Sequence, residues 1–214
     1  MNVGVLGSGV VGRVLGGGFA KYRHQVMIGT RDSDKKDLTE WAGQTGAKTG
    51  SFEEAARFGE IIVLAGLGRA AESIIDLARP ANFDRKTVID AMNPLADGAP
   101  VNGVLKYTTG PNESLGEWIQ AKLPNARVVK AFNSVGNAMM INPNFSQGTP
   151  TMFICGNDAQ AKSKVGEIVR QFGWEPYDCG SIVSARALEP LCMLWCLPGF
   201  LNNEWQHAFK MLTH

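Results

Sequence analysis

Residues 1–13 read MNVGVLGSGVVGR, and this stretch decides the fold. Its apolar opening suits a short, buried strand of a parallel sheet. Three glycines follow at the spacing G-x-G-x-x-G: Gly7, Gly9 and Gly12. We expect Gly7 to permit the tight turn out of the strand and Gly9 to let a pyrophosphate approach the backbone. Gly12 is expected to let the next helix pack closely on the sheet.

The sequence around these glycines indicates a dinucleotide site. A helix that begins near Val10 would direct its free N–H groups and its positive dipole end toward phosphate groups. An ordinary glycine-rich turn is the alternative, because the chain contains 25 glycines. The motif comes directly after a strand pattern and before a helix pattern, and this context favours dinucleotide binding.

The end of the second expected strand, Gln25–Gly29, indicates which dinucleotide binds. NAD-binding folds usually place Asp or Glu there, to accept hydrogen bonds from the ribose hydroxyls. This chain has Thr30 and Arg31 instead, and a guanidinium with a hydroxyl binds a 2′-phosphate that a carboxylate would repel. Two charge-assisted bonds of roughly 1.5–3 kcal/mol each favour NADP over NAD by about a hundredfold or more. Asp32 leaves an alternative open, since it takes the ribose role if it turns inward.

Two lysines, Lys35 and Lys36, lie about one turn beyond Arg31. They either add positive charge near the phosphate or are ordinary solvated side chains. We include Lys35 among the expected cofactor-binding residues.

The remaining chain repeats the strand–helix alternation. Right-handed crossovers between such units give a doubly wound, mostly parallel sheet with helices on both faces, the Rossmann arrangement. We expect one NADP-binding α/β domain over residues 1–214, with a core at 1–141. The further expected strands of the core lie at 47–49, 60–66, 86–92 and 127–131, and its expected helices include 10–22, 33–45, 68–79 and 114–123.

Residues 142–214 are expected to add two strands, at 151–155 and 174–177, and a short helical C-terminal tail. The segment Ser184–Leu197 is strongly apolar, and Pro198 with Gly199 is expected to break it before a final helix over Phe200–Leu212. This apolar tail forms either core or the surface of a homodimer.

Bulk properties exclude several classes of protein. The formal net charge of +1 predicts no nucleic-acid partner. The chain contains no run of about 18 apolar residues, so we expect no membrane span. A strand that starts at residue 2 leaves no room for a signal peptide. The four cysteines form no C-x-x-C pair, so we expect reduced thiols in a cytoplasmic protein.

Five segments, in this order, resemble the NADPH-dependent deazaflavin oxidoreductases named for coenzyme F420: GVLGSGVVGRVLGGGFA, GTRD, DAMNPL, VVKAFNSV and ARALEP. That group includes many predicted dinucleotide-binding proteins, and the cytosolic domains of six-transmembrane metalloreductases are similar. The resemblance covers nearly the whole chain. Its glycine motif is generic, whereas DAMNPL and VVKAFNSV are more specific.

The resemblance also implies a role for each part of the site. It implies that the pyrophosphate is held by Gly7, Ser8, Gly9, Val10 and Val11, and the 2′-phosphate by Thr30 and Arg31. Between adenosine and nicotinamide, the cofactor would run along Ala65, Gly66, Leu67 and Asn93. The nicotinamide and the second substrate would lie beside Ala131, Phe132 and Asn133. One departure is Gly66-Leu67-Gly68, where such proteins often carry a proline and a bulky residue; this reshapes the acceptor pocket. From its position alone, Asn93 is either a ligand contact at a strand end or an ordinary turn residue before Pro94.

The implied reaction is hydride transfer between nicotinamide and a flavin- or deazaflavin-like acceptor. Both reactive groups then belong to cofactors, and the protein only holds them about 3–3.5 Å apart, so we assign no catalytic residue and no metal ligand. One alternative is a non-catalytic NADP(H)-sensing module that acts through the apolar tail. Another is a small-substrate dehydrogenase or imine reductase, which needs a longer helical C-terminal domain or a Lys or His near Asn93. Lys130 is the nearest, but it lies in a strand.

Overall fold

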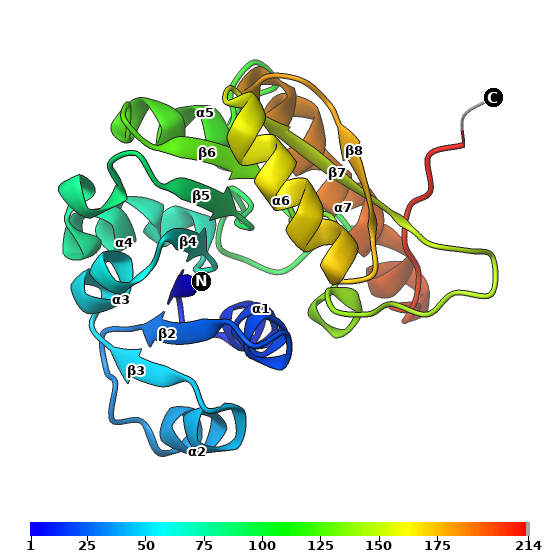
Figure 1. Ribbon diagram of the computed structural model, residues 1–214. Helices are drawn as coiled ribbons and strands as arrows, with labels where there is room; N and C mark the ends of the chain where they lie inside the picture. The colour runs from blue at the N-terminus through cyan, green and yellow to red at the C-terminus, as the bar shows by residue number, and fades with distance from the viewer. Residues whose placement is uncertain (213–214) are drawn as a thin grey trace.

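One eight-stranded sheet runs through the computed structural model, which describes residues 1–212 (Figure 1). The strand order is β3-β2-β1-β4-β5-β6-β7-β8. Neighbouring strands are parallel except β6 and β7, which are antiparallel. This confirms the doubly wound, mostly parallel sheet. The strands are β1 (Asn2–Leu6), β2 (Gln25–Gly29), β3 (Lys48–Gly50), β4 (Ile61–Leu64), β5 (Thr87–Asp90), β6 (Arg127–Lys130), β7 (Thr151–Gly156) and β8 (Glu175–Asp178).

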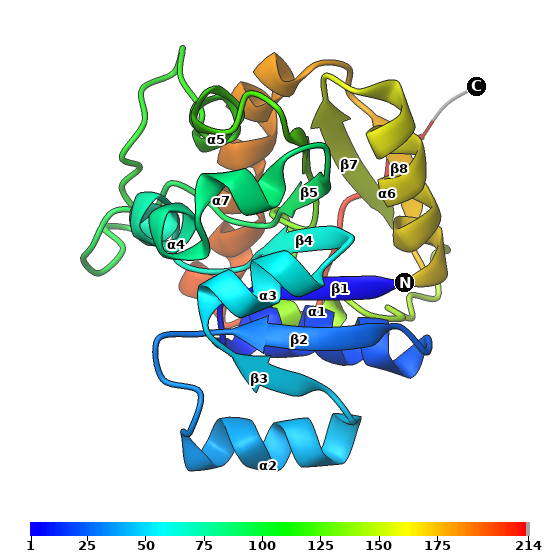
Figure 2. The same cartoon turned by 60° about the vertical axis from the view of Figure 1, so that its left-hand side comes forward.

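Helices cover both faces of this sheet (Figure 2). Helices α1 and α6 pack on one face, whereas α3, α4 and α5 pack on the other. The helices of the described residues are α1 (Val10–Lys21), α2 (Lys36–Thr45), α3 (Phe52–Phe58), α4 (Ala71–Ala78), α5 (Leu115–Lys122), α6 (Ala159–Gln171) and α7 (Ala185–Asn202), with short 3-10 turns at Gly68–Ala70, Pro80–Phe83, Asn137–Met139 and Ile182–Ser184.

The central strand β4 shows why the strands read as continuous apolar runs. Ile61 and Val63 belong to the core beneath α1 and α6. Ile62 and Leu64 belong to the core beneath α3, α4 and α5. All four side chains are fully buried. Because alternate residues point to opposite, covered faces, neither face of the strand needs polar residues.

Two expected helices begin later than the sequence patterns predict. Helix α2 begins at Lys36 rather than Ser33, because residues 32–35 form a turn in which the Asp34 amide donates to the Asp32 carboxylate at 3.3 Å. The helix expected over 68–79 is divided into a 3-10 turn and α4, which begins at Ala71.

The expected break at Pro198 is wrong. Helix α7 continues through Pro198 to Asn202, and its C-cap residue Asn203 has a left-handed backbone. Packing outweighs the local penalty of a proline inside a helix: a Cβ on Gly199 would lie 2.3 Å from the ring of Trp205, so the chain after the helix folds back tightly against it. Within residues 1–212, no helix is both long enough and apolar enough for a membrane crossing.

The expected final helix over 200–212 is also wrong beyond Asn202. Residues 203–212 are not helical. They run along the start of β7, where the Thr151 amide donates to the Phe209 carbonyl at 2.8 Å. The indole of Trp195 donates to the His207 carbonyl at 2.8 Å, and the His207 ring stacks on that indole. Hydrogen bonds to β7 and aromatic stacking thus hold this segment in place without a helix.

Candidate functional site

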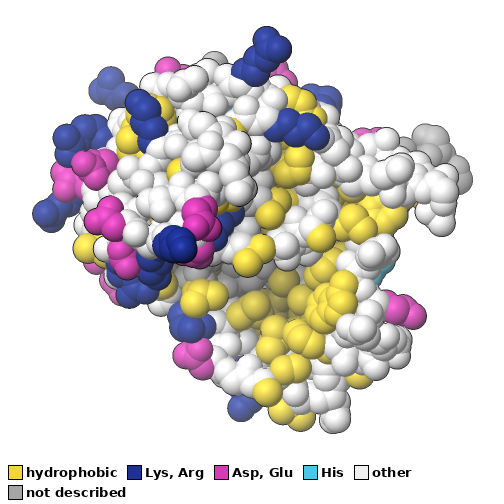
Figure 3. Space-filling model, turned by 90° about the horizontal axis from the view of Figure 1, so that it is seen from below, with side chains coloured by type: hydrophobic (Ala, Val, Ile, Leu, Met, Phe, Trp, Pro, Cys, Tyr) yellow, Lys and Arg dark blue, Asp and Glu magenta, His cyan; other side chains and the backbone are white. Residues whose placement is uncertain are grey.

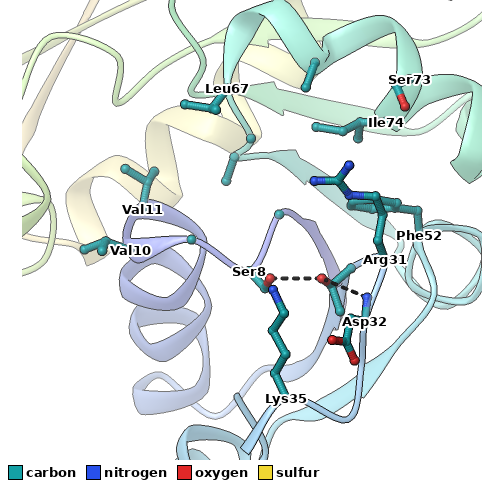
Figure 4. A pocket seen from close by; sticks show the side chains of 16 residues that line it. Ser8, Val10, Val11, Arg31, Asp32, Lys35, Phe52, Leu67, Ser73 and Ile74 are labelled. Atoms are coloured by element: carbon teal, nitrogen blue, oxygen red, sulfur yellow. Dashed lines mark hydrogen bonds between the residues drawn. The ribbon is translucent and has the colours of Figure 1, made fainter. Parts of the chain in front are cut away.

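A cavity of about 380 Å³ opens at the carboxyl ends of β1, β2 and β4 (Figure 4). In open α/β sheets this edge is where ligands bind. The structure brings most of the expected cofactor-binding residues together here: Gly7, Ser8, Gly9, Val10, Val11, Thr30, Arg31, Lys35, Ala65, Gly66 and Leu67.

The three motif glycines have the different roles that their spacing predicts. Gly7 has a φ of 133°, and a Cβ there would lie 2.6 Å from the Ala65 carbonyl oxygen. A Cβ on Gly12 would lie 1.9 Å from the Gly7 carbonyl oxygen, so only glycine lets α1 start this close to the turn. A Cβ on Gly9 would meet no atom of the described residues within 4 Å. Gly9 therefore keeps open a space that lies within the cavity.

This difference predicts opposite outcomes for two alanine substitutions. Gly9→Ala should leave the melting temperature unchanged but weaken NADP binding at least about tenfold, because its methyl group occupies the space that the pyrophosphate needs. Gly12→Ala should lower the melting temperature, because the turn itself must open. Thermal melting and titration calorimetry measure the two effects; a Gly9→Ala protein that binds NADP normally would contradict the assigned role.

The beginning of α1 supplies hydrogen-bond donors to the cavity. Gly9 is the N-cap residue, and no side chain caps the helix. The first N–H groups of a helix have no acceptor within it. Gly9, Val10 and Val11 all line the cavity, so these donors and the helix dipole can meet an anion there.

Positive and hydroxyl side chains lie at the other end of the cavity. The Ser8 hydroxyl donates to Thr30 Oγ1 at 3.0 Å, which ties the glycine-rich turn to the end of β2. Arg31 extends across the cavity toward the side of Phe52, and Lys35 points toward Ser8 (Figure 4). This arrangement can surround a phosphate on the adenosine ribose.

Asp32 also lines the cavity. One of its carboxylate oxygens accepts the hydrogen bond from the Asp34 amide, so this carboxylate takes part in the turn before α2.

Some residues lining the cavity were not expected from the sequence. Phe52 is the first residue of α3 and lies inside the capping box that Ser51 and Glu54 form. Its place after β3 at the same sheet edge was a usable signal. The positions of Ala70, Ser73 and Ile74 depend on how α4 packs, which no short motif reveals. These lining residues are Phe52, Ala70, Ser73 and Ile74.

Five expected residues do not line the cavity: Gly12, Asn93, Ala131, Phe132 and Asn133. Ala131, Phe132 and Asn133 are buried, and Phe132 has a φ of 63°, which is rare for a bulky residue. The side-chain amides of Asn93 and Asn133 are joined by a hydrogen bond of 3.1 Å. Asn93 is partly exposed, so it is the accessible member of this pair.

Lys130 belongs to a buried charge cluster and not to the cavity. Its Nζ lies 2.5 Å from Asp90 Oδ2, 2.7 Å from Glu189 Oε1 and 2.9 Å from the Met92 carbonyl oxygen. Burial lowers the pKa of Lys130, but Asp90 and Glu189 outweigh it, so the net direction is upward. A cation held in this way is not accessible to a substrate. Within residues 1–212, no group of three or more His, Cys, Asp and Glu side chains is arranged to hold a metal ion.

Comparison with known proteins identifies the relatives of this chain. Residues 2–94 match the family described as NADP oxidoreductase, coenzyme F420-dependent. Metalloreductase STEAP3 of Rattus norvegicus is 30% identical over 208 residues, which cover 93% of this chain and 38% of the relative. The F420-dependent NADP reductase of Methanocaldococcus jannaschii is 26% identical over 181 residues, which cover 80% of each chain.

Solved structures share the fold over the whole chain. The crystal structure of a candidate F420-dependent NADP-reductase from Arthrobacter sp. FB24 has a TM-score of 0.90 at 29% identity and covers 99% of each chain. An imine reductase from Aspergillus terreus has a TM-score of 0.67 at 13% identity, which shows the fold alone.

This chain spans only 38% of the length of the rat metalloreductase. The named relatives are reductases, which is the class that the sequence predicts. The resemblance inferred from the five sequence segments is confirmed: this chain is similar to the coenzyme F420-dependent NADP oxidoreductases, by the family match at residues 2–94 and by its likeness to an F420-dependent NADP reductase in sequence and in structure.

Proposed function

We propose that this chain is an oxidoreductase that transfers hydride between NADP(H) and a flavin- or deazaflavin-like acceptor. The observation that carries the proposal is the set of groups that line the cavity at the carboxyl ends of β1, β2 and β4. Unpaired N–H groups at the start of α1 and the open space at Gly9 lie at one end, and Thr30, Arg31 and Lys35 lie at the other. A dinucleotide with a 2′-phosphate needs both features at once.

Each end of the cavity would hold one anionic part of the cofactor. The N–H groups of α1 would bind the pyrophosphate, and Thr30 with Arg31 would bind the 2′-phosphate while Lys35 adds positive charge. The nicotinamide supplies the hydride chemistry when it is bound. The protein then has to orient the ring and exclude water, and we assign that part to the strand ends that carry Asn93 and Asn133.

The surface of the protein supports an apolar, ring-shaped acceptor. One face gathers hydrophobic side chains around a hollow (Figure 3). The exposed hydrophobic side chains include Val10 and Leu67 at the cavity and Leu194 and Leu201 on α7. Flat aromatic rings pack well on such surfaces. The exposed residues of α7 likewise support a homodimer, and the free thiols of all four cysteines are consistent with a cytoplasmic protein.

Stopped-flow oxidation of bound NADPH tests the acceptor. We expect a flavin or a deazaflavin to oxidise NADPH in the presence of the protein, faster than free NADPH is oxidised. Quinone and iron chelates serve as comparison acceptors, the latter because some relatives are metalloreductases. If the protein binds NADPH but none of these acceptors turns over, the enzyme proposal fails. A sensing module would then be indicated by a partner whose capture in a pull-down depends on NADP.

A small-substrate dehydrogenase or imine reductase is not favoured. Imine reductases share the fold at 13% identity. Such a reaction would need a Lys or His near Asn93, and the nearest candidate is Lys130. The ammonium group of Lys130 is fully buried between two carboxylates.

A further inference from the structure

Arg13, on the first turns of α1, reaches back to the glycine-rich turn from outside the cavity. Its Nε donates a hydrogen bond to the Ser8 carbonyl oxygen at 2.9 Å. Its Nη2 lies 2.6 Å from the Asp37 carboxylate, in the first turn of α2. Arg13 therefore connects the turn after β1 with the helix after β2.

Ser8 is held at two points by these contacts. Its carbonyl oxygen accepts from Arg13 on one side, and its hydroxyl donates to Thr30 on the other. Ser8 lines the cavity together with Gly9 and Thr30. Arg13 does not; it lines a shallow groove with Gly17 and Trp41 beside α1.

The position of the Ser8 carbonyl determines where the next N–H group points. No cis peptide bond occurs in the described residues, and in a trans peptide the C=O of one residue and the N–H of the next point in opposite directions. When Arg13 holds the Ser8 carbonyl away from the cavity, the Gly9 N–H is directed toward it. No acceptor for the Gly9 N–H is found among residues 1–212.

We propose that Arg13 is a positioning residue for cofactor binding, which aims the Gly9 N–H at the pyrophosphate by fixing the Ser8 carbonyl. This inference rests on the proposed function, since it assumes that NADP occupies the cavity. Asp37 has a smaller role, which is to orient the guanidinium of Arg13. The hydrogen bond from Arg13 lowers the pKa of the Asp37 carboxyl and so favours its charged form.

Two substitutions at position 13 separate the bond to Ser8 from the charge. In Gln, the amide nitrogen is the same number of bonds from the backbone as Nε is in Arg. Arg13→Gln therefore keeps a donor for the Ser8 carbonyl but loses the ion pair with Asp37. Arg13→Met has a similar length and no donor. Asp37→Ala removes the ion pair and the carboxylate's hydrogen bonds at the start of α2, but keeps the bond from Arg13 to Ser8.

A comparison of two ligands distinguishes a misplaced Gly9 N–H group from general damage to the site. NADP carries a pyrophosphate, whereas 2′-AMP carries the adenosine and the 2′-phosphate without one. We expect Arg13→Met to weaken NADP binding about tenfold and to change 2′-AMP binding less than about twofold. Arg13→Gln and Asp37→Ala should bind NADP within about threefold of the parent protein. By contrast, Arg31→Ala should weaken both ligands.

Titration calorimetry gives the affinities, and thermal melting confirms that each variant is folded. Arg13 is partly exposed, and Arg13→Ala is the second removal variant if Arg13→Met does not fold. The inference is overturned by equal losses for NADP and 2′-AMP, by no loss in either removal variant, or by a tenfold NADP loss in Arg13→Gln. If the parent protein itself does not bind NADP, the proposed function fails, which is a different result from all of these.

Discussion

The Lys130→Met variant should lose about 3–5 kcal/mol of unfolding free energy, because it leaves two carboxylates buried without their cation. The side chains of Lys130 and Asp90 are 0% exposed and that of Glu189 is 2% exposed. Glu189 would keep its hydrogen bonds from the amides at the start of α5. Asp90 Oδ2 accepts no hydrogen bond within the described residues, so its ion pair with Lys130 is its only polar contact there, and the variant would lose it. Domains are typically stable by about 5–15 kcal/mol, so this is a large share of the total.

Lys122→Met is a matched control for this experiment. Lys122 also lies between two carboxylates, those of Glu72 and Asp76, but at the surface. Solvent screens such pairs, so the control should change stability little. Urea denaturation of the two variants measures the difference. A loss in Lys130→Met no larger than that in Lys122→Met would show that the buried cluster is not held by its cation.

The pH dependence of this contribution follows from the direction of the pKa shift. The pKa of Lys130 is raised above its ordinary value in the folded protein. Folding therefore favours the protonated amine, and this stabilisation is fully present below the ordinary lysine pKa. It is lost only as the pH rises through the raised pKa. We therefore compare the free energies of unfolding of the parent protein and of Lys130→Met. Titration of Lys130 should not reduce the difference between them at any pH from neutral up to the ordinary lysine pKa.

Arg31→Ala should raise the dissociation constant for NADPH at least tenfold and hardly change that for NADH. Arg31 lines the cavity and extends across it (Figure 4). A guanidinium bonded to a phosphate contributes roughly 1.5–3 kcal/mol, which is about tenfold or more in affinity. NADH has no 2′-phosphate, so it does not use this contact. Fluorescence titration with both reduced nucleotides measures the ratio.

Lys36→Ala is the control for Arg31→Ala. Lys36 has the same charge and lies in the same region of the chain, but its side chain is 90% exposed and lies near Glu40. It should leave both affinities unchanged. If Arg31→Ala weakens NADPH and NADH equally, the 2′-phosphate assignment is wrong and Asp32 becomes the residue to examine for a role at the ribose.

The sequence predicts the fold well because the signals for it are local. Most strands of the parallel core contain a short apolar run, as β1 and β4 do, and each glycine of the motif has a backbone role set by its immediate neighbours. The same holds for Ser51 and Glu54, whose spacing predicts the capping box that the structure contains. Predictions are less accurate where distant segments decide the outcome. Helix α7 crosses Pro198, and the chain after it is not helical, because Trp195 packs against Gly136, Trp205 and His207.

Sequence alone determined the parallel strands, the glycine-rich turn and the cationic end of β2, because these depend on backbone conformation and on residues a few positions apart. Only the tertiary structure decided which charges meet. It placed Glu189 against Lys130 and Asp37 against Arg13. The physical reason is that a buried or bridging charge is stabilised by whichever opposite charge the packing of whole helices brings near, and no local pattern encodes that distance.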